Sequence, residues 1–336
     1  MKLISDFDLT PVTTFHVPAS TRWYGEFKDT AQLVELLDCN ELSELPVMFM
    51  GGGSNLLFAR PYEGAILRSA NDDITILGSD NGYRFINTGA GTNWDKFVKF
   101  TVDNGLYGAE NLSYIPGETG ASAVQNVGAY GVEAKDIIHS VHVYDTVRRC
   151  EADIPVSDCR YAYRDSMFKH CPSRYVVLDV TYRLSEKELY NLEYGPLKEL
   201  KNDLALSPAK VRERVIEIRK SKLPDPGETG SAGSFFKNPV VDRKIFEELK
   251  SHYPDIPSYV ADADRIKIPA GWLIEHAGLK GATEGGASVY QRQCLVIVNN
   301  GNATATDVIN LSRRVIATVL EKFGVELSPE VNIIGL

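Results

Sequence analysis

The sequence predicts an α+β protein in which short, mostly antiparallel strands outnumber the helices. Two observations favour this class. Residues 137–145 and 174–184 are rich in β-branched and aromatic residues, which is the composition of strands. Apolar residues at helical spacing are confined to a few stretches, within 83–108, 207–226 and 306–324.

The length and composition set the scale of the molecule. A chain of 336 residues exceeds the ~250–300 residues at which one hydrophobic core stops growing, so we expect two or three domains. Hydrophobic residues make up 43% and charged residues 24%, as in ordinary globular proteins. The net charge of −9 argues against a general binder of nucleic acids or membrane surfaces, because both of these partners are anionic.

No targeting, membrane or metal-binding pattern is expected in this chain. The start "MKLISDFDLT" lacks the apolar core of a signal peptide, and no run approaches the ~18 apolar residues of a membrane helix. The five cysteines are scattered without a C-x-x-C pair, which favours a reducing compartment. His139 and His142 lie three apart in a strand-like run and would face opposite sides. The expectation is a cytoplasmic protein without a metal.

The first predicted elements surround glycines. "VMFMGGGSNLLFA" (47–59) predicts a strand, a glycine loop and a second strand, because apolar residues flank the glycines closely on both sides. Residues 83–108 begin extended and continue as a helix that Asn104-Gly105 ends. The apolar residues of that helix are three and four apart: Trp94, Phe97, Val98 and Thr101.

Two more helices lie in the second half of the chain. The first begins with Ser207 as N-cap and Pro208 in its first turn, and ends before Pro224, near which we place a domain boundary. The second spans 306–324 with Gly324 after its last turn. Its apolar stripe consists of Val308, Leu311, Val315, Val319 and Phe323. A strand-like segment ends the chain.

Residues 51–55, "GGGSN", form the first loop that could bind a ligand. A Rossmann fingerprint needs a third glycine and a following helix, but Leu56 stands at that glycine position and a strand is predicted next. The loop "GAGTNW" (89–94) fails in the same way at Trp94. Consecutive small residues can still present backbone N–H groups to a phosphate. A tight hairpin is the alternative interpretation of 51–55.

The second candidate loop is "YIPGETGASAVQNVGAYGVE" (114–133). Its glycines and alanines leave little side chain over a long span, so a flat ligand or a pyrophosphate could lie against the backbone. Gln125 and Asn126 add amide groups and Tyr130 adds a ring. An irregular loop that packs on itself is the alternative. Together the two loops favour one large nucleotide cofactor bound without a Rossmann fold.

Further motifs accompany these loops in a fixed order: "YAYRDSMFK" (161–169), "KLPDP" (222–226), "AGSFFKNP" (232–239) and "SPEV" (328–331). From about residue 13 to 334 the set resembles the UDP-N-acetylenolpyruvoylglucosamine reductase family, flavoenzymes of cell-wall precursor synthesis. "LEYGPL" (192–197) is similar to the subgroup with an extra tyrosine-bearing loop over the substrate. Two positions depart from the family pattern: Thr13, where "TTF" replaces Asn-Thr-Phe, and Ser231, where asparagine is expected.

The resemblance implies an FAD-binding fold of the vanillyl-alcohol-oxidase (PCMH) type with a C-terminal α+β substrate domain. The expected parts are FAD-binding subdomain 1 at 1–70 with 327–336, FAD-binding subdomain 2 at 71–216, and the substrate-binding domain at 217–326. The implied reaction uses NADPH to reduce FAD. Hydride then goes to the enolpyruvyl C3 of UDP-N-acetylglucosamine enolpyruvate and a proton to C2, which gives UDP-N-acetylmuramate for peptidoglycan synthesis. The expected partners are this substrate and NADPH, and the expected state is a monomer.

The resemblance also implies site residues, taken position by position. Cofactor contacts are expected from both loops and one arginine: Gly51, Gly52, Gly53, Ser54, Asn55, Ile115, Pro116, Gly117, Gly120, Ala121, Gln125, Asn126, Gly128, Ala129, Tyr130, Gly131 and Arg219. Substrate contacts are expected from Tyr194, Lys222, Asn238 and Gln293. Arg212, Arg219 and Lys222 lie on the helix within 207–226, and complementing the helix dipole is the alternative role for these cations.

Three residues are candidates for the chemistry. Hydride addition to the enolpyruvyl group places negative charge on C2 and the carboxylate, so a fixed cation and a proton donor are needed. Arg164 could supply the cation, or could be a surface arginine paired with Asp165. Ser234 matches the family's proton donor, with a turn residue as the alternative. Glu330, and not Glu326, matches the catalytic glutamate; apolar neighbours should bury or half-bury it, and a salt bridge is the alternative.

Two other functions share part of this pattern. An FAD-dependent oxidase would have the same glycine loops, and a non-catalytic protein could bind a nucleotide-sugar without flavin. "AGSFFKNP" and "SPEV" argue against the oxidase.

Overall fold

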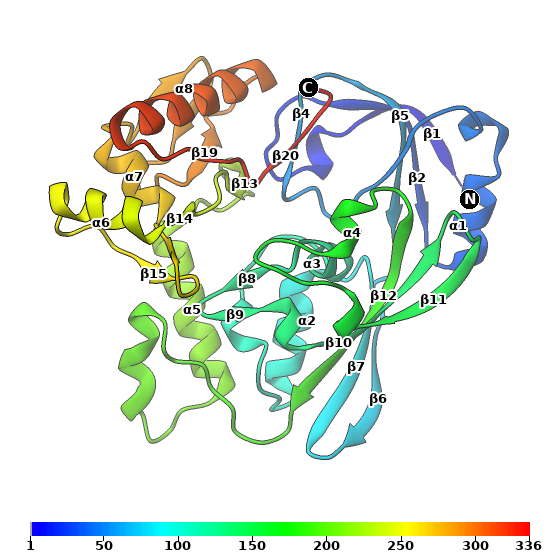
Figure 1. Cartoon of the computed structure of the whole chain (residues 1–336). Coiled ribbons are helices and arrows are strands. Elements are labelled where there is room, and N and C mark those ends of the chain that lie inside the picture. Colours follow the sequence, from blue (N-terminus) through cyan, green and yellow to red (C-terminus); the bar gives the residue numbers. More distant parts are fainter. Residues whose placement is uncertain (1) are drawn as a thin grey trace. The chain divides into compact units, whose positions relative to one another are not determined.

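The computed structural model describes residues 2–336, and the contacts between its Cα atoms divide the chain into two compact units (Figure 1). Unit 1 comprises the residues up to Phe7, Thr21–Gly53 and Glu63–Lys220. Unit 2 comprises Asp8–Ser20, Ser54–Tyr62 and Ser221–Leu336. The expected division into three domains stays a prediction. The two units are described separately below.

Unit 1 contains a four-stranded sheet, a five-stranded sheet and a small two-stranded sheet at residues 128–133. The four-stranded sheet has the order β1-β2-β5-β3, with β1 Leu3–Asp8, β2 Ser20–Phe27, β5 Tyr62–Ser69 and β3 Val47–Phe49. The five-stranded antiparallel sheet has the order β11-β10-β12-β7-β6, with β11 Cys150–Pro155, β10 Ile138–Asp145, β12 Tyr175–Ser185, β7 Tyr83–Gly89 and β6 Ile74–Asp80. The strands predicted within 137–145 and 174–184 are therefore confirmed as the centre of this sheet.

Five α-helices begin in unit 1: α1 Thr30–Leu37, α2 Trp94–Asp103, α3 Thr119–Gln125, α4 Met167–His170 and α5 Pro208–Lys222. The helix predicted within 83–108 is confirmed as α2, where the Asn93 side chain accepts a hydrogen bond from the Lys96 N–H (2.9 Å). In α5 the predicted N-cap is confirmed, because the Ser207 hydroxyl accepts from the Lys210 N–H (3.3 Å). Short 3₁₀ helices lie at Asn40–Leu42, Glu110–Leu112, Ala134–Asp136, Val156–Asp158 and Gly195–Asn202.

Aromatic residues form the centre of the core beneath the five-stranded sheet. Trp94 and Phe97 of α2 pack on Tyr182 of β12, with ring centroids 6.0 and 4.3 Å from the tyrosine ring. All three side chains are buried. This packing fixes α2 against the sheet and so fixes the loop 104–118 that leads from α2 into α3.

Unit 2 contains three small sheets and three helices. A four-stranded sheet has the order β13-β19-β18-β17, with β13 Gly230–Ser234, β19 Val296–Asn299, β18 Ala287–Val289 and β17 Thr283–Glu284. A three-stranded sheet contains β14 Val240–Asp242, β16 Arg265–Lys267 and β15 Tyr259–Val260, and a parallel pair joins β20 Asn332–Ile334 to β4 Leu56–Phe58. The helices are α6 Arg243–His252, α7 Ala270–His276 and α8 Ala305–Phe323, and a 3₁₀ turn spans Thr10–Val12.

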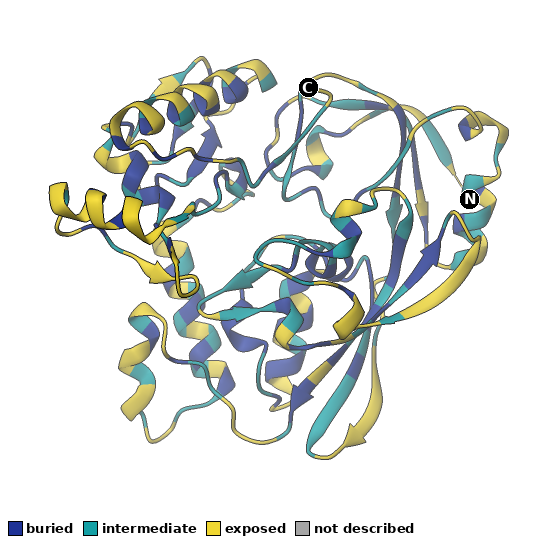
Figure 2. Cartoon of the chain, in the orientation of Figure 1, coloured by how far each residue is buried: buried dark blue, intermediate teal, exposed yellow. Residues whose placement is uncertain are grey.

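Helix α8 has one buried face and one exposed face, as Figure 2 shows. The predicted stripe is confirmed, since every one of its members is buried: Val308, Leu311, Val315, Val319 and Phe323. Gly324 follows the last turn at φ +65°, the left-handed conformation expected of a C-cap glycine. At the other end the side chains of Thr304 and Asp307 form a capping box.

The glycine loop at 51–55 joins two strands, as predicted, but the hairpin alternative is wrong. β3 pairs in parallel with β5, whereas β4 pairs in parallel with β20. The two strands that flank the loop therefore belong to different sheets and do not pair with each other. No helix follows the loop, which agrees with the rejection of a Rossmann fingerprint.

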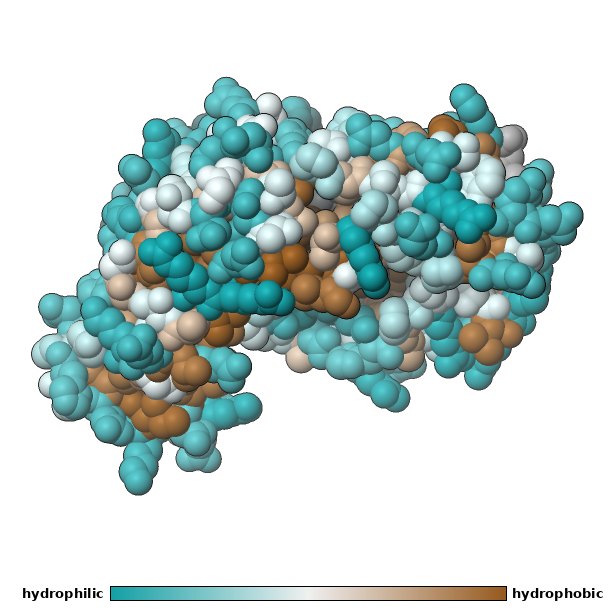
Figure 3. All heavy atoms as spheres, turned by 90° about the horizontal axis from the view of Figure 1, so that it is seen from above, coloured by the Kyte–Doolittle hydropathy of each residue, from teal (hydrophilic) through white to brown (hydrophobic). Residues whose placement is uncertain are grey.

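On the face drawn in Figure 3, hydrophilic side chains cover most of the surface and hydrophobic ones form patches between them. Between residues 2 and 336 no helix is both long enough and apolar enough to span a bilayer.

Candidate active site

The two candidate loops of unit 1 pack directly on each other. A Cβ added at Gly51 would lie 3.1 Å from the Ala121 Cβ and 3.2 Å from Glu118 Oε2, and one added at Gly120 would lie 2.7 Å from the Ala90 Cβ. These glycines are therefore required for close backbone packing. Gly53, at φ +60°, donates its N–H to the Gly51 carbonyl (2.8 Å), which makes a tight turn.

This turn leaves backbone donors available to a ligand. Within residues 2–336, the N–H groups of Gly51 and Gly52 have no hydrogen-bond partner. Unsatisfied N–H groups on successive small residues are the feature that binds phosphate oxygens in nests. The loop at 51–53 therefore fits the pyrophosphate of a dinucleotide cofactor.

A partly buried ion pair between Arg68 and the buried Glu118 packs against this loop. Arg68 of β5 donates from Nε (3.2 Å) and from Nη2 to Glu118 Oε1. Burial raises the pKa of Glu118 although Arg68 opposes that shift, and the Glu118 Oε2 atom is buried without a partner among the described residues. Sequence analysis missed this pair. The glutamate within "PGETG" was visible, but its partner is 50 positions away.

The second loop ends in a hairpin of β8 Gly128–Ala129 and β9 Val132–Glu133. Tyr130 and Gly131 form its turn with φ values of +50° and +83°, as a primed hairpin turn requires. Asn126, at φ +48°, is fully buried and donates to Glu133 Oε2 (3.0 Å) and to the Ala162 carbonyl (2.9 Å). Its side chain therefore holds the loop in shape.

Arg164 joins this second loop. Its Nη2 donates to the Gly128 carbonyl at 2.9 Å, and its own carbonyl accepts from Lys169 Nζ at 3.0 Å. Lys169 also donates to the Gln125 side chain (3.1 Å). The alternative pairing of Arg164 with Asp165 is not the arrangement found, because Asp165 Oδ2 lies 2.8 Å from His170 Nε2. The structure thus brings the predicted catalytic arginine to the predicted cofactor loop.

Arg219 lies on α5 near the same loop. Its Nε donates to the Tyr114 carbonyl (2.9 Å), and its guanidinium interacts with the Tyr130 hydroxyl. Burial lowers the pKa of Arg219, and the nearby Arg164 adds to this effect. A half-buried cation that contacts Tyr114 and Tyr130 of the loop fits an anionic or electron-rich ligand.

Arg212 has a different role from the one considered first. It donates to both carboxylate oxygens of Asp95 (2.6 and 2.7 Å), so it forms a bidentate pair with α2 and is more than a complement to the helix dipole. Burial alone would raise the pKa of Asp95, but the bonds from Arg212 and the Tyr114 N–H lower it. Asp95 thereby fixes both α5 and the start of the second loop.

The remaining predicted cofactor residues of unit 1 lie on the same two loops and on α3: Ile115, Pro116, Gly117, Ala121 and Ala129. Tyr194 also lies in unit 1, and its ring meets that of Tyr130 edge-on at 5.6 Å. Ser54 and Asn55 belong to unit 2. The cofactor roles of all these residues stay predictions.

Ser234 ends β13 of unit 2, after a bulge. The register with β19 shifts between Ser231 and Ser234, and Gly233 adopts φ +69° there. A Cβ at Gly230 would lie 2.2 Å from the Phe15 carbonyl oxygen, so only glycine fits at the start of the strand. Phe235 and Phe236 are buried in the core, as expected of residues that anchor this loop.

Glu330 lies beside this serine loop. Its N–H donates to the Phe235 carbonyl (2.7 Å), and its carbonyl accepts from Asn55 Nδ2 (3.2 Å). Phe236 and Pro329 form a bridge, and the Lys237 N–H donates to the Ser328 carbonyl (2.9 Å). Glu330 is half-buried, within the expected range. The structure therefore brings together the segments that carry the two predicted proton-handling residues, through backbone hydrogen bonds, although the two residues are 96 positions apart in the sequence.

The predicted substrate residues of unit 2 have structural partners. Asn238 Oδ1 accepts from the Ala270 N–H (2.9 Å) at the start of α7. Gln293 Oε1 lies 2.7 Å from the position of a Cβ on Gly271 of the same helix. Lys222 is exposed at the end of α5. Substrate contacts by these residues stay predictions.

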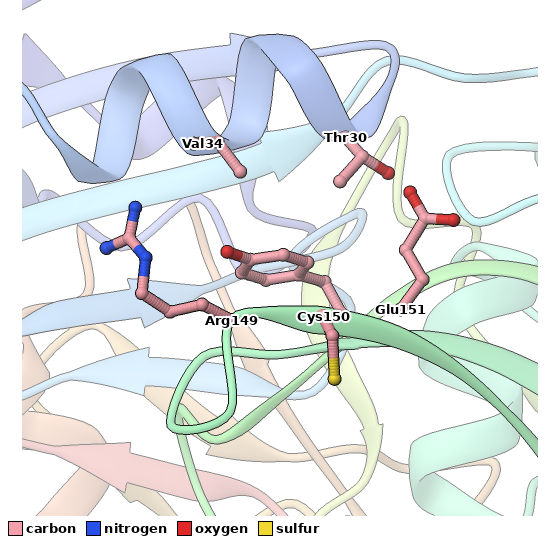
Figure 4. A pocket seen from close by; sticks show the side chains of 6 residues that line it. Thr30, Val34, Arg149, Cys150 and Glu151 are labelled. Carbon is pink, nitrogen blue, oxygen red and sulfur yellow. The ribbon is translucent and has the colours of Figure 1, made fainter.

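An open hollow elsewhere in unit 1 is not this site. It has a volume of about 510 Å³ and is lined by Thr30 and Val34 of α1 with Tyr144, Arg149, Cys150 and Glu151 (Figure 4). None of the predicted site residues lines it, and Arg149 donates to both oxygens of Asp38 (2.8 and 2.7 Å). Among residues 2–336 no three histidine, cysteine or acidic side chains are grouped to hold a metal ion.

Family models match both parts of the chain. Residues 24–147 match an "FAD binding domain", and residues 225–334 match "UDP-N-acetylenolpyruvoylglucosamine reductase, C-terminal domain". The two matched ranges contain the two glycine loops and the Ser234–Glu330 region, respectively. The predicted fold class, a flavin-binding fold with a C-terminal α+β domain, is confirmed.

Full-length relatives agree with these matches. A UDP-N-acetylenolpyruvoylglucosamine reductase of Bacteroides fragilis is 44% identical over 98% of this chain and 99% of its own length. One of Porphyromonas gingivalis is 42% identical over 99% of this chain and 100% of its own. The crystal structure of the UDP-N-acetylenolpyruvylglucosamine reductase from Thermus caldophilus has a TM-score of 0.66 at 25% identity, covering 99% of this chain and 98% of that chain.

Proposed function

The chain belongs to the UDP-N-acetylenolpyruvoylglucosamine reductase family, and from this premise we propose that it reduces UDP-N-acetylglucosamine enolpyruvate to UDP-N-acetylmuramate. It is an FAD-dependent oxidoreductase of peptidoglycan precursor synthesis with NADPH as reductant. A bound FAD would supply the hydride chemistry between NADPH and the enolpyruvyl C3, and the residues of this chain would hold the groups and handle the proton. The observation that carries the proposal is the combination of a donor-rich glycine turn in unit 1 with a serine and a glutamate on two hydrogen-bonded segments of unit 2.

The loops of unit 1 would hold the cofactor. The N–H groups of Gly51 and Gly52 would donate hydrogen bonds to its pyrophosphate. The hairpin with its turn at Tyr130-Gly131 would place further backbone beside the cofactor. Arg219 supplies a cation that the loop itself orients through the Tyr114 carbonyl. A cation held by backbone before the ligand arrives costs little reorganisation when charge develops nearby.

Arg164 would stabilise charge on the substrate. Hydride addition at C3 leaves negative charge on C2 and the substrate carboxylate, and a guanidinium matches a carboxylate geometrically. The bond from Nη2 to the Gly128 carbonyl restricts the side chain, so the cation is held near the cofactor loop. Fixed positive charge at this place lowers the energy of the developing carbanion.

Ser234 would deliver the proton to C2, and Glu330 would support that transfer. The register with β19 shifts between Ser231 and Ser234, where Gly233 has a positive φ, and the buried Phe235 side chain anchors the backbone directly after Ser234. The Phe235 carbonyl and the Asn55 side chain bind the backbone of Glu330, which fixes this backbone next to the serine loop. A serine is a weak acid, so its proton transfer depends on such neighbours.

Anaerobic flavin absorbance tests this proposal. The purified protein with FAD is reduced by NADPH, and UDP-N-acetylglucosamine enolpyruvate is then added. Return of the oxidised flavin spectrum with this substrate, and no return with UDP-N-acetylglucosamine, is the expected result. A flavin that stays reduced until oxygen enters would indicate an oxidase, and a protein that binds no FAD would contradict the assignment of the glycine loops.

A further inference from the structure

Four ionisable side chains of unit 1 form a network that ends at the glycine turn of residues 51–53. Tyr24 and Glu26 lie on β2, and Arg68 lies on the neighbouring strand β5 (Figure 1). The Tyr24 hydroxyl donates to Glu26 Oε1 (2.7 Å), and Arg68 Nη1 lies 4.0 Å from the same oxygen. Arg68 also donates to Glu118, which directly precedes α3. None of these four groups takes part in the proposed hydride and proton transfers.

One cation in this network faces two carboxylates of different exposure. The Glu26 side chain is 48% exposed, whereas that of Glu118 is 5% exposed. Burial raises the pKa of Tyr24 to about 12, so this hydroxyl stays neutral near neutral pH. Burial is the largest influence on the pKa of Glu118 and raises it, Arg68 lowers it, and the charge of Glu26 raises it. Glu118, which water solvates least, is therefore the carboxylate that gains most from a proton.

The two oxygens of Glu118 have different surroundings. Arg68 donates from both Nε and Nη2 to Oε1. Oε2 is buried and has no hydrogen-bond partner within residues 2–336. It lies against the glycine turn, because a Cβ on Gly51 would be 3.2 Å from Oε2 and one on Gly52 would be 3.6 Å from the carboxyl carbon. Since Arg68 occupies Oε1, a proton on this carboxyl group would lie on Oε2, the oxygen next to the turn.

The charge and the donors at this turn match a pyrophosphate only when Glu118 is neutral. The N–H groups of Gly51 and Gly52 are donors without partners among the described residues. A pyrophosphate is anionic, and its oxygens accept hydrogen bonds from such donors. An ionised carboxylate beside the turn would repel this ligand. A protonated carboxyl group would remove that repulsion and leave the positive charge of Arg68 free to attract the pyrophosphate.

We propose that Glu118 belongs to the pyrophosphate site of FAD as a neutral acid, so that cofactor binding is coupled to uptake of one proton by this side chain. The proton comes from solvent and forms an O–H bond at Oε2. In the free protein, the bonds from Arg68 favour the ionised form, and the arrival of the pyrophosphate shifts the balance. The inference requires that FAD binds, but it does not depend on which sugar the enzyme reduces.

The coupling determines how FAD affinity depends on pH. Where Glu118 is ionised in the free protein and protonated in the complex, binding takes up one proton, and the dissociation constant rises about tenfold for each unit of pH. At lower pH the free protein is already protonated at Glu118, so the affinity no longer changes with pH.

Isothermal titration calorimetry of the FAD-free protein with FAD measures the coupling. Titrations at one pH, in buffers of different ionisation enthalpy, give the number of protons taken up. Repeating them between about pH 5.5 and pH 8 should give a maximum near one proton for each FAD, with the dissociation constant from flavin fluorescence rising in parallel. This measurement uses the unmodified protein, so it does not depend on whether a variant folds.

Glu118→Gln is the decisive variant, because glutamine has the shape of the protonated acid and cannot ionise. Its amide can present oxygen to Arg68 and N–H to the turn. FAD binding by this variant should take up no proton, and at pH 8 it should be about tenfold tighter than in the unmodified protein. Glu26→Gln should keep the uptake but shift it to lower pH, because Glu26 favours the protonated form of Glu118. Glu35→Gln, at an exposed glutamate of α1, is the matched control for the loss of one charge.

Three results would overturn the inference: no proton uptake by the unmodified protein at any pH in this range, equal uptake by Glu118→Gln and the unmodified protein, or weaker FAD binding by Glu118→Gln than by the unmodified protein at pH 8. A proton taken up by Glu26 would give the second result, with the uptake lost in Glu26→Gln instead. Failure of the proposed function has a different signature, because an FAD complex that does not turn over UDP-N-acetylglucosamine enolpyruvate would still show the proton uptake.

Discussion

The glycine loops of unit 1 and the serine loop of unit 2 achieve their shapes in opposite ways. In unit 1 the geometry is local: positive φ at Gly53, Asn126, Tyr130 and Gly131 bends short stretches into turns that present backbone groups. In unit 2 the geometry is long-range: the serine loop is hydrogen-bonded to a segment far along the chain, because the Phe235 carbonyl accepts from the N–H of Glu330, 95 positions later. The first kind of site depends on which residues tolerate a turn, and the second depends on which distant segments come together.

This difference predicts which substitutions should impair each of the two sites. The loop at 51–53 offers backbone groups to its ligand, so few side-chain substitutions can remove them. We therefore expect this loop to be most sensitive to loss of the pair of Arg68 and Glu118 that packs against it. A site made of two side chains on neighbouring backbone segments loses its chemistry when one group is deleted, while the backbone bonds remain. Four single-residue variants, at Ser234, Arg68, Glu330 and Glu110, separate these cases.

Ser234→Ala should have the largest effect and leave the cofactor loops of unit 1 untouched. Loss of a proton donor costs roughly 10³-fold in the half-reaction with the enolpyruvyl substrate. Flavin reduction by NADPH should proceed at the normal rate, because that step needs no proton from unit 2. Stopped-flow absorbance of the flavin measures both half-reactions, with Ser258→Ala, an exposed serine of unit 2, as control. Equal losses in both half-reactions would show that Ser234 is structural.

Arg68→Met tests the support beneath the loops. It leaves the Glu118 carboxylate buried without its cation, which should cost about 3 kcal/mol in the free energy of unfolding. Urea unfolding followed by circular dichroism measures this loss. The double variant Arg68→Met, Glu118→Gln should recover most of it, because no charge is then left unpaired. A loss below about 1 kcal/mol would place the pair among solvated surface salt bridges.

Glu330→Gln tests whether this carboxylate of unit 2 assists the proton transfer. The backbone bonds to Phe235 and Asn55 do not need the carboxylate, so the fold should be unchanged. The enolpyruvyl half-reaction should slow on the order of 10²-fold, as expected for loss of a group that assists proton transfer. Glu326→Gln, an exposed glutamate four residues earlier, is the control. Near-normal turnover of Glu330→Gln would remove this residue from the mechanism.

Glu110→Gln should have the smallest effect, and one that depends on pH. Burial raises the pKa of Glu110 from 4.5 to about 7, against the opposing bond from the Gly108 N–H (2.6 Å). The folded state therefore binds this proton more tightly than the unfolded state, and the stability of the unmodified protein falls as pH rises between the two values. From pH 5 to pH 8, the variant should gain roughly 2 kcal/mol relative to the unmodified protein.

Urea unfolding at both pH values measures that difference, and Glu35→Gln, an exposed glutamate of α1, controls for the loss of one charge. A constant gap between Glu110→Gln and the unmodified protein would show that Glu110 is ionised in the fold at both pH values. The same variant also reports whether the loop 104–118 tolerates a neutral side chain there.

The sequence by itself determined the elements whose signals are local. The stripe of α8, the cap at Ser207 and the helix from Trp94 were all predictable, because periodicity and capping act within one or two turns. The order of six motifs also identified the family, and with it the candidate residues Ser234, Glu330 and Arg164.

Only the tertiary structure decided the contacts between distant segments. The strands around 51–55 joined different sheets, Arg212 paired with Asp95, and Arg68 paired with Glu118. None of these partners lies within a helical turn or a hairpin of the other in sequence, so no local pattern records them. The physical reason is that a hydrogen bond or an ion pair depends on distance in space, which the folded backbone sets after the local elements have formed.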